Sequence, residues 1–251
     1  DIGDITCLVG KNEAGKTSLP HALYKLNPLI SNEANFDETD DYPRTDVEDY
    51  QHEVEQGERE PATVINATFI LDSEIEDITS DFGSKALKSK KLTLKKGYEN
   101  SKKYWLDVNE EEALKHCIRN SSCSKDLKDQ LKASKLFSDA NELLEEFETK
   151  TEDEDLIKLI NSINKSGFLS YVYTNYVKPS IPQFLYFDSY YQLTGQENIE
   201  ALIKRKSNDD LRPSDYPMLG LLSLARIEVE QLLNPDRTQE LVNKIEGAGN
   251  H

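Results

Sequence analysis

The chain has 251 residues, a formal net charge of −17 and three cysteines. A chain of this length can bury a full hydrophobic core in one or two domains without disulfides. So acidic a protein cannot bind nucleic acid over its whole surface, although a local basic patch is compatible with this charge. Cys7, Cys117 and Cys123 lack metal-ligand spacing, which predicts a reducing, cytoplasmic compartment and no structural metal.

No apolar stretch approaches the roughly 20 residues that cross a bilayer. The first residues, Asp1-Ile2-Gly3-Asp4, do not form a basic segment followed by an apolar one. We therefore expect a protein that is neither secreted nor membrane-spanning. Hydrophobic residues make up 37% and charged residues 31%, and the apolar ones recur in periodic blocks, which predicts long exposed helices rather than disorder.

Residues 10–17 read Gly-Lys-Asn-Glu-Ala-Gly-Lys-Thr, the pattern of a phosphate-binding P-loop. Glycines at both ends allow successive main-chain N–H groups to point into one anion-sized nest. Lys16 adds a positive charge for the β- and γ-phosphates, and Thr17 offers a hydroxyl to Mg²⁺. The sequence therefore predicts a nucleoside triphosphate site with Mg²⁺, formed by Gly10, Asn12, Glu13, Ala14, Gly15, Lys16, Thr17 and Ser18.

The flanks of this motif supply the context that it needs. An apolar run at 5–9 predicts a strand, and Leu19, Leu23 and Leu26 predict a helix that presents its amino end to a phosphate. A glycine-rich turn that binds nothing would not need a strand before it and a helix after it. No Asn-Lys-x-Asp guanine-reading motif occurs, which disfavours GTPases, whereas small kinases stay candidates.

The middle of the chain predicts a β-lobe. Residues 32–61 are acidic and irregular, which is typical of a long exposed connection. Thr63 to Leu71 is rich in β-branched residues and predicts a strand, with a helix beginning at 72–75. Two more strands are predicted to pair through a turn at Gly97 and Asn100, namely Lys91 to Leu94 and Lys103 to Val108.

Helical patterns dominate the remainder. Glu110 to Lys165 predicts a helical insertion or arm, in which Leu156, Leu159, Ile160 and Ile163 share one face. Residues 183–188 predict a buried strand, and three later segments predict helices: 196–204, 214–233 and 236–245. We therefore expect an ATPase lobe at 1–109, a helical arm at 110–180, and a return to the ATPase core at 181–251.

Three segments together carry a resemblance: 7–19 around the P-loop, Tyr42-Pro43-Arg44 with Tyr50 downstream, and 67–71. They are similar to the amino-terminal ATPase of the overcoming-lysogenization-defect (OLD) nuclease family, which is related to the ATP-binding-cassette (ABC) heads of RecF and SMC proteins. The resemblance implies an α/β P-loop NTPase of ABC/SMC-head type, with an antiparallel β-lobe and a helical insertion. It also implies ATP as the nucleotide, a dimer of ATPase heads, and control of a nuclease or other effector in DNA processing or phage defence.

Several family features have no counterpart in this sequence. A signature motif, a Walker B strand ending in Asp-Glu and a switch histidine are not recognised, and the scattered histidines His21, His52, His116 and His251 suggest no catalytic group. Leu221-Leu222-Ser223-Leu224 lacks the signature glycines and predicts core helix. The P-loop begins at residue 10, which leaves no room for opening strands, so we expect a fragment truncated at both ends.

The predicted strand at 184–188 allows three interpretations. Four apolar residues and Asp188 have the form of a Walker B strand, whose carboxylate would hold the water shell of Mg²⁺. Ser189 then stands where a hydrolysing head has glutamate, so no general base follows. Alternatively the strand leads to a Q-loop in which Gln192 contacts the metal or the attacking water, or it is only a buried strand that ends in a surface turn.

Positive charge is concentrated in one segment, with tyrosines and the tryptophan Trp105 interleaved: Lys85, Lys88, Lys90, Lys91, Lys95, Lys96, Lys102 and Lys103. These lysines could follow a DNA backbone, since lysines neutralise phosphates without reading sequence. The plainer interpretation is a solvated hairpin whose lysines protect an exposed edge.

Three functional hypotheses follow. The first is an ATPase head that closes a dimer around ATP and controls an effector, with little turnover by this chain alone. The second is a nucleotide-dependent scaffold that assembles with a partner without hydrolysis. The third is a small P-loop kinase with Asp188 as its metal carboxylate, which the acidic helices and the lack of an arginine-rich lid disfavour.

Overall fold

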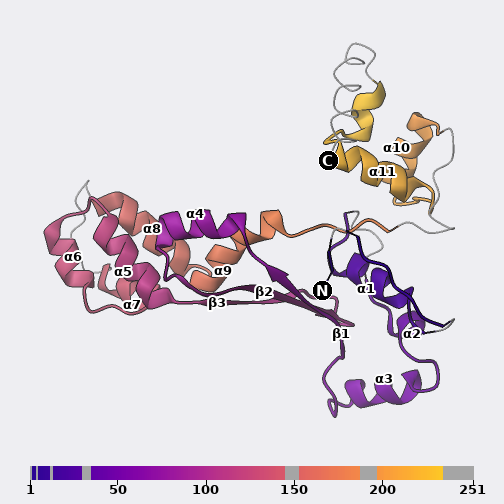
Figure 1. Ribbon diagram of the computed structural model, residues 1–251, viewed down its shortest axis with the longest axis horizontal. Coiled ribbons are helices and arrows are strands. Elements are labelled where there is room, and N and C mark those ends of the chain that lie inside the picture. Colours follow the sequence, from indigo (N-terminus) through magenta and orange to yellow (C-terminus); the bar gives the residue numbers. More distant parts are fainter. Residues whose placement is uncertain are drawn as a thin grey trace. The chain divides into compact units, whose positions relative to one another are not determined.

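The chain folds into two units (Figure 1). The computed structural model describes residues 2–3, 5–11, 14–29, 35–144, 153–186 and 197–233. The first unit comprises Asp1–Ile65, Gly97–Asn100 and Pro182–His251, and the second comprises Asn66–Lys96 and Ser101–Ile181. The domain boundaries expected from the sequence remain a prediction.

Helices make up most of the regular structure in the first unit. Their bounds are α1 Ser18–Leu26, α2 Glu38–Asp41, α3 Val47–Glu55, α10 Ile199–Ser207, α11 Asp215–Leu224 and the 3-10 helix η5 Val229–Leu233. The helix predicted after the P-loop is therefore confirmed as α1, and the one predicted at 196–204 as α10. The helix predicted at 236–245 lies outside the described residues.

The apolar run at 5–9, predicted to be a strand, has no strand geometry. Ile5 and Val9 are 95% and 91% exposed. A strand forms where a neighbouring strand takes up its main-chain hydrogen bonds, and in the described part of the chain no strand pairs with this run. The apolar pattern indicated only that these residues are compatible with a strand. It carries no information on whether a neighbouring strand is present to pair with them.

The connection at 32–61 is more ordered than predicted, because it contains α2 and α3 and packs into an aromatic cluster. Tyr42 stacks on Tyr50 with ring centroids 4.3 Å apart, and Tyr98 lies 5.8 Å from both. Tyr50 is 1% exposed, and its hydroxyl accepts a hydrogen bond from Ala62 N at 2.9 Å. Burial, and then the charge of Asp41, raises the pKa of Tyr98 to about 12.

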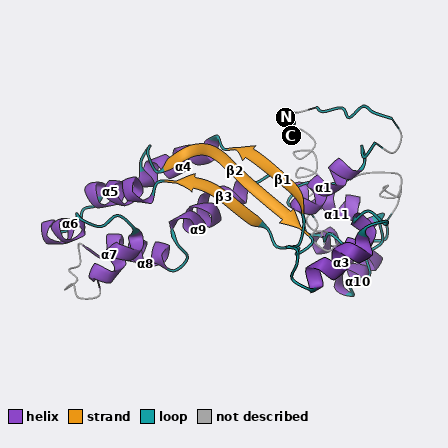
Figure 2. Cartoon of the chain, turned by 90° about the horizontal axis from the view of Figure 1, so that it is seen from below, coloured by secondary structure: helices purple, strands orange, loops and turns teal. Residues whose placement is uncertain are grey.

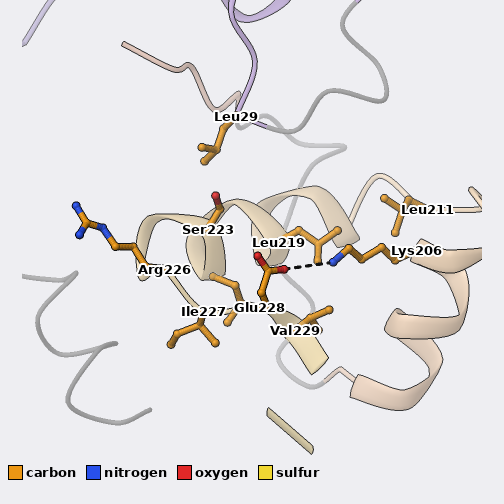
Figure 3. Close-up of a pocket in the computed structure, with 10 residues that line it drawn as sticks. Leu29, Lys206, Leu211, Leu219, Ser223, Arg226, Ile227, Glu228 and Val229 are labelled. Carbon is orange, nitrogen blue, oxygen red and sulfur yellow. Dashed lines mark ion pairs between the residues drawn. The ribbon is translucent and has the colours of Figure 1, made fainter. Parts of the chain in front are cut away.

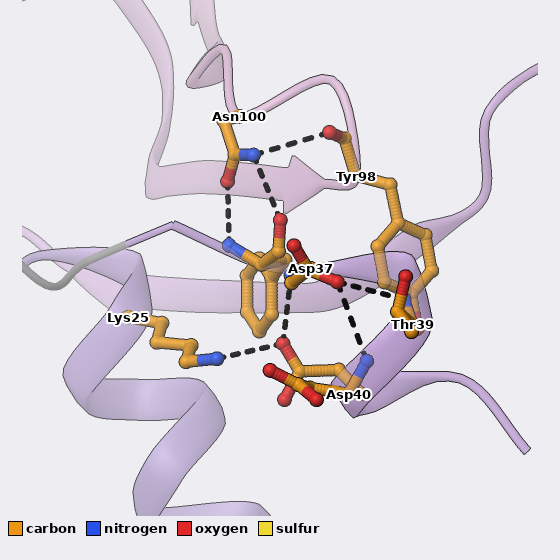
Figure 4. Close-up of polar contacts among 8 residues, drawn as sticks. Lys25, Asp37, Thr39, Asp40, Tyr98 and Asn100 are labelled. Atoms are coloured by element: carbon orange, nitrogen blue, oxygen red, sulfur yellow. Dashed lines mark hydrogen bonds and ion pairs between the residues drawn. The ribbon is translucent and has the colours of Figure 1, made fainter.

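Asn100 joins the turn after β2 to the segment before α2 (Figure 4). Its Oδ1 accepts from Phe36 N at 2.7 Å, and its Nδ2 donates to Phe36 O at 2.9 Å and Tyr98 O at 3.2 Å. Asn100 has φ 59°, a left-handed conformation that asparagine tolerates better than most residues. Nearby, Lys25 of α1 forms an ion pair of 2.6 Å with Asp41, which links α1 to α2.

An antiparallel sheet with the order β1-β2-β3 confirms the predicted β-lobe. The strands are β1 Thr63–Ile70, β2 Leu87–Gly97 and β3 Lys103–Val108, and α4 Ser73–Phe82 follows β1 as predicted. Leu92 pairs with Leu106, and Leu94 pairs with Tyr104. The leucines of these pairs are at most 1% exposed, so they form the inner face of the sheet.

The helical arm predicted after the sheet is confirmed as a series of short helices in the second unit. They are α5 Glu110–Asn120, α6 Lys125–Leu131, α7 Phe137–Leu144, α8 Glu154–Asn164, α9 Phe168–Val172, the π-helix η3 Tyr173–Val177 and the 3-10 helix η4 Lys178–Ser180 (Figure 1). The predicted apolar face of α8 is buried at Leu156, Ile160 and Ile163. Phe168 contacts both Phe82 and Phe137, with centroids 5.1 and 5.3 Å apart.

Two predictions for the end of the chain need correction. The strand predicted at 183–188 is reduced, among described residues, to one parallel bridge between Phe184 and Pro28. The helix predicted at 214–233 breaks after Leu224, because Arg226 adopts φ 55°. The core predicted at 221–224 holds for Leu222, 6% exposed, but Leu221 and Leu224 are 43% and 59% exposed.

A buried ion pair joins α10 to α11. Arg205 donates from Nε and Nη2 to the two carboxylate oxygens of Asp215, at 2.7 and 2.6 Å, and Asp215 is fully buried. Burial alone would raise the pKa of Asp215, but the hydrogen bond and charge of Arg205 outweigh it and hold that pKa below its usual value. The pair therefore stabilises the fold only while Asp215 is ionised.

Replacing Asn100 tests the clamp, by which we mean its three hydrogen bonds to the main chain of Phe36 and Tyr98. Asn100→Ala should destabilise the protein by about 1–3 kcal/mol, because it removes three hydrogen bonds and leaves a side chain in a left-handed conformation. Asn100→Gly removes the same bonds without the strain and should cost less. Urea denaturation measures both. Equal stability of the wild type and Asn100→Ala would show that the clamp is not formed.

Asp215→Asn should cost about 1.5–3 kcal/mol, because it weakens the charge-assisted hydrogen bonds from Arg205 and leaves Glu197, at 2.9 Å, as the remaining ion-pair partner of Arg205. The exposed Asp210→Asn is the matched control and should change stability by less than about 0.5 kcal/mol. Because the folded-state pKa of Asp215 is lowered, its contribution is complete above the unfolded-state pKa and is lost as pH falls through the folded-state pKa. Thermal melts of both proteins from neutral to strongly acidic pH measure this contribution. If the difference in melting temperature between wild type and Asp215→Asn does not change with pH, this account is contradicted.

Candidate functional site

The glycine-rich loop stands between the exposed run at 5–9 and α1. Of the eight predicted ligand residues, the structure describes Gly10 and 14–18, whereas Asn12 and Glu13 lie outside the described residues. Gly10, Ala14, Gly15, Thr17 and Ser18 are exposed, and Lys16 is half-buried. The described part of the loop is therefore accessible to a ligand from solvent.

The main chain of this loop is arranged to receive an anion. Gly15 has φ +75°, which turns the chain into the start of α1. Ser18 N donates back to Gly15 O at 3.1 Å, and Ala14 N donates to Lys11 O at 3.3 Å. Within the described residues, the N–H groups of 15–17 donate to no acceptor. Three successive donors without an acceptor at a helix start favour negative charge.

Lys16 folds back over its own loop. Its ammonium donates to Gly10 O at 3.0 Å and also to Lys11 O. Main-chain carbonyls are neutral acceptors, and a hydrogen bond from an ammonium to a charged phosphate oxygen is about twice as strong as a neutral one. A phosphate that entered the nest would therefore compete favourably for the Lys16 ammonium.

Thr17 is the residue before α1, and its side chain makes no capping hydrogen bond. Its hydroxyl is exposed, which suits the predicted role as an Mg²⁺ ligand. Mg²⁺ keeps several waters and shares its remaining positions with one or two protein groups and phosphate oxygens. A single hydroxyl beside an anion nest therefore fits a nucleotide-bound Mg²⁺.

The far end of α1 contacts the segment that leads to Asp188. Phe184 N donates to Asn27 O at 2.8 Å, Leu29 N donates to Phe184 O at 2.9 Å, and His21 lies 4.2 Å from Tyr186 between ring centroids. Sequence reasoning missed the His21 contact, because a single histidine on a helix gives no signal for one. Asp188 and Gln192 themselves lie outside the described residues, so their roles remain predictions.

A hollow elsewhere in the first unit has different chemistry (Figure 3). It has a volume of about 310 Å³, and its apolar wall includes Leu219, Leu222 and Ile227. Its charged lining residues are Lys206, Arg226 and Glu228, and Lys206 is paired with Glu228 at 3.7 Å and with Glu230 at 3.3 Å. No P-loop residue lines it, so we do not assign it to the nucleotide.

The second unit also has a pocket, of about 680 Å³, lined by Asp81, His116, Cys117 and Tyr176 among others. Tyr176 donates its hydroxyl to Asp81 Oδ2 at 2.6 Å. Burial, and then the charge of Asp81, raises the pKa of the Cys117 thiol to about 12. Since the thiolate is the reactive form, Cys117 is not a nucleophile at neutral pH.

Among the described residues, no group of three or more histidine, cysteine or acidic side chains is placed to hold a metal ion. No helix in the same residues has both the length and the apolar character to span a membrane.

The loop geometry and the helix that follows it define a P-loop nucleotide-binding protein. A protein-family model described as an AAA ATPase domain matches residues 1–246, and the chain therefore belongs to this family. It is an ATP-binding ATPase domain, and its mixed helices and small antiparallel sheet fit an α/β P-loop fold. No curated protein and no solved structure matches the chain.

Gly15 provides a test of the loop geometry. Gly15→Ala should weaken ATP binding about tenfold, because a side chain at φ +75° costs about 1–2 kcal/mol and re-aims the donors. Gly3→Ala is the matched control, since Gly3 has open space around it and no positive φ, and it should bind as the wild type does. Isothermal titration calorimetry measures both affinities. Unchanged binding by Gly15→Ala would rule out the loop conformation described here.

Proposed function

We propose that the loop formed by Gly10 and 12–18 binds the triphosphate of ATP together with Mg²⁺. The observation that carries this proposal is that, among the described residues, the N–H groups of 15–17 have no acceptor and the Lys16 ammonium has only the carbonyls of Gly10 and Lys11. The N–H groups would hold phosphate oxygens, Lys16 would neutralise the β- and γ-phosphates, and Thr17 would bind Mg²⁺. Membership in the AAA ATPase domain family supports ATP as the nucleotide.

The wider role follows from the resemblance to the OLD nuclease family. We propose an ATPase head of ABC/SMC type that dimerises around ATP and couples this closure to a nuclease or other effector, in DNA processing or phage defence. The three cysteines are free thiols, which supports a reducing compartment such as the cytoplasm. Asp188 as a metal carboxylate or, alternatively, Gln192 in contact with the metal or the attacking water would complete the proposed site.

Removing the Lys16 charge tests the ligand assignment. Lys16→Ala should weaken ATP–Mg²⁺ binding by about 10- to 100-fold, which corresponds to the loss of one hydrogen bond between charged groups. Lys11→Ala is the matched control, because it removes the same charge from the same loop but leaves the Lys11 carbonyl in place. It should change the affinity by less than about threefold. A fluorescent ATP analogue in an anisotropy titration with excess Mg²⁺ gives both values.

Equal weakening by the two lysine variants, or none by Lys16→Ala, would contradict the proposed site. Phosphate release measured on the same samples distinguishes the ATPase hypothesis from the hypothesis of a non-hydrolysing scaffold. Turnover that disappears in Lys16→Ala supports the ATPase, whereas tight ATP binding without turnover in any assembly supports the non-hydrolysing scaffold. Transfer of phosphate to a small acceptor would instead favour the kinase.

A further inference from the structure

The outer face of the three-stranded sheet combines positive charge with an exposed aromatic ring. Residues 85–105 contain eight lysines and one acidic residue, Glu99, in a chain whose net charge is −17. Lys90, Lys91 and Lys95 are exposed, and no ion pair involves them in the described part of the chain. Residues 85–105 therefore form a positively charged segment in an otherwise acidic protein.

Strand register places part of this charge on one face. Lys95 lies directly opposite Lys103, and Thr93 lies opposite Trp105 in the adjacent pair of the same face. Successive side chains of a strand point to opposite faces, so this set alternates with the buried leucines of the inner face. Trp105 is 65% exposed. We call the face formed by Thr93, Lys95, Lys103 and Trp105 the lysine–tryptophan face.

Helices of the second unit cover the opposite face of the sheet. Tyr104 stacks on Tyr173 of η3 with ring centroids 3.7 Å apart, and its hydroxyl donates to Ser170 of α9 at 3.1 Å. Figure 2 views the sheet from the side on which the strands lie in front of α4 and α9. On β1, Ile70 is also exposed, at 77%.

Like charges directly opposite across a strand pair repel each other, and Lys95 and Lys103 are such a pair. An exposed Trp side chain also leaves a large apolar surface in water. A ligand with closely spaced negative charges and flat apolar rings would complement both the paired lysines and the exposed Trp105 ring.

Single-stranded nucleic acid has this chemistry. Its phosphates are neutralised by lysines without sequence preference, and its unpaired bases stack on exposed aromatic side chains. A duplex keeps its bases stacked on one another, so it offers no free ring to Trp105 on an open sheet face. We propose that the lysine–tryptophan face binds single-stranded nucleic acid, with Lys95 and Lys103 at phosphates and Trp105 against a base.

This inference deepens the proposed role in DNA processing, but it does not depend on the P-loop. The test is therefore made without nucleotide, so that failure of ATP binding and failure of nucleic-acid binding can be distinguished. Lys16→Ala should bind single strands as tightly as the wild type.

Trp105 is the one tryptophan of the chain, so its fluorescence reports directly on this face. A 20-nucleotide oligo(dT) should quench Trp105 fluorescence, and a labelled copy should show raised anisotropy at the same protein concentrations. Both signals should weaken as salt rises, because counterions are released when lysines bind phosphates. The same oligonucleotide annealed to oligo(dA) should bind more weakly and should not quench.

Two variants locate the surface. Lys95→Glu/Lys103→Glu should weaken oligo(dT) binding at least about tenfold and reduce the salt slope by about 1.4, and Trp105→Ala should weaken it about tenfold. The control Lys125→Glu/Lys132→Glu makes the same charge change at exposed positions of α6 and its end, in the same unit, and should bind as the wild type. Circular dichroism and thermal melts check that each variant is folded.

Four results would overturn the proposal: no binding of oligo(dT) at low salt, binding without Trp105 quenching, equal weakening by the α6 control, or equal affinity for the duplex. Polyglutamate and anionic lipid vesicles serve as competing probes. If either binds this face as tightly as oligo(dT) and quenches Trp105 equally, the face is a general anion surface and the assignment to nucleic acid is wrong.

Discussion

The amino end of α1 concentrates positive charge at one point of an acidic chain. Among the described residues, the N–H groups of 15–17 there have no acceptor, and the Lys16 ammonium has only main-chain carbonyls as acceptors. Carbonyl dipoles satisfy its hydrogen bonds but do not neutralise its charge. The loop is therefore arranged for an anion, and its proposed function follows from that electrostatic imbalance.

Contacts within the first unit hold the carboxyl end of α1 in place. Lys25 pairs with Asp41, Asn100 fixes the chain at Phe36, and the aromatic cluster of Tyr42, Tyr50 and Tyr98 packs beside them. The resemblance drew attention to Tyr42 and Tyr50 as part of a family pattern. The structure shows that both rings contribute to packing, so this part of the pattern is explained by the fold of the first unit.

Local sequence patterns correctly predicted the structural features that are determined by residues close together in the sequence. The β-branched run at 63–71, the turn at Asn100 and the apolar face of α8 were all predicted, because each reflects a periodicity or a turn residue. The strand at 5–9 was predicted wrongly, since strands depend on partners that are remote in sequence. Likewise, the break at Arg226 follows from a backbone conformation that arginine seldom adopts, which no periodicity reports.

The candidate site shows the same division. The motif predicted a loop followed by a helix, which the described residues 14–17 and α1 show, because the motif consists of consecutive residues; its ligand residues stay a prediction. The contact of Tyr186 with His21 brings together residues remote in sequence, and the pattern at 184–188 gave no indication of it. The outer face of the sheet required strand register before Lys95, Lys103 and Trp105 could be placed together.

Hydrogen–deuterium exchange of the peptide covering 10–18, with and without ATP–Mg²⁺, tests the central claim most directly. The account predicts that nucleotide slows exchange of the amides at 15–17, which have no acceptor among the described residues, and leaves exchange in the strands β2 and β3 unchanged. The account would be contradicted if saturating ATP left the exchange rates of these three amides unchanged while it slowed exchange elsewhere in the protein.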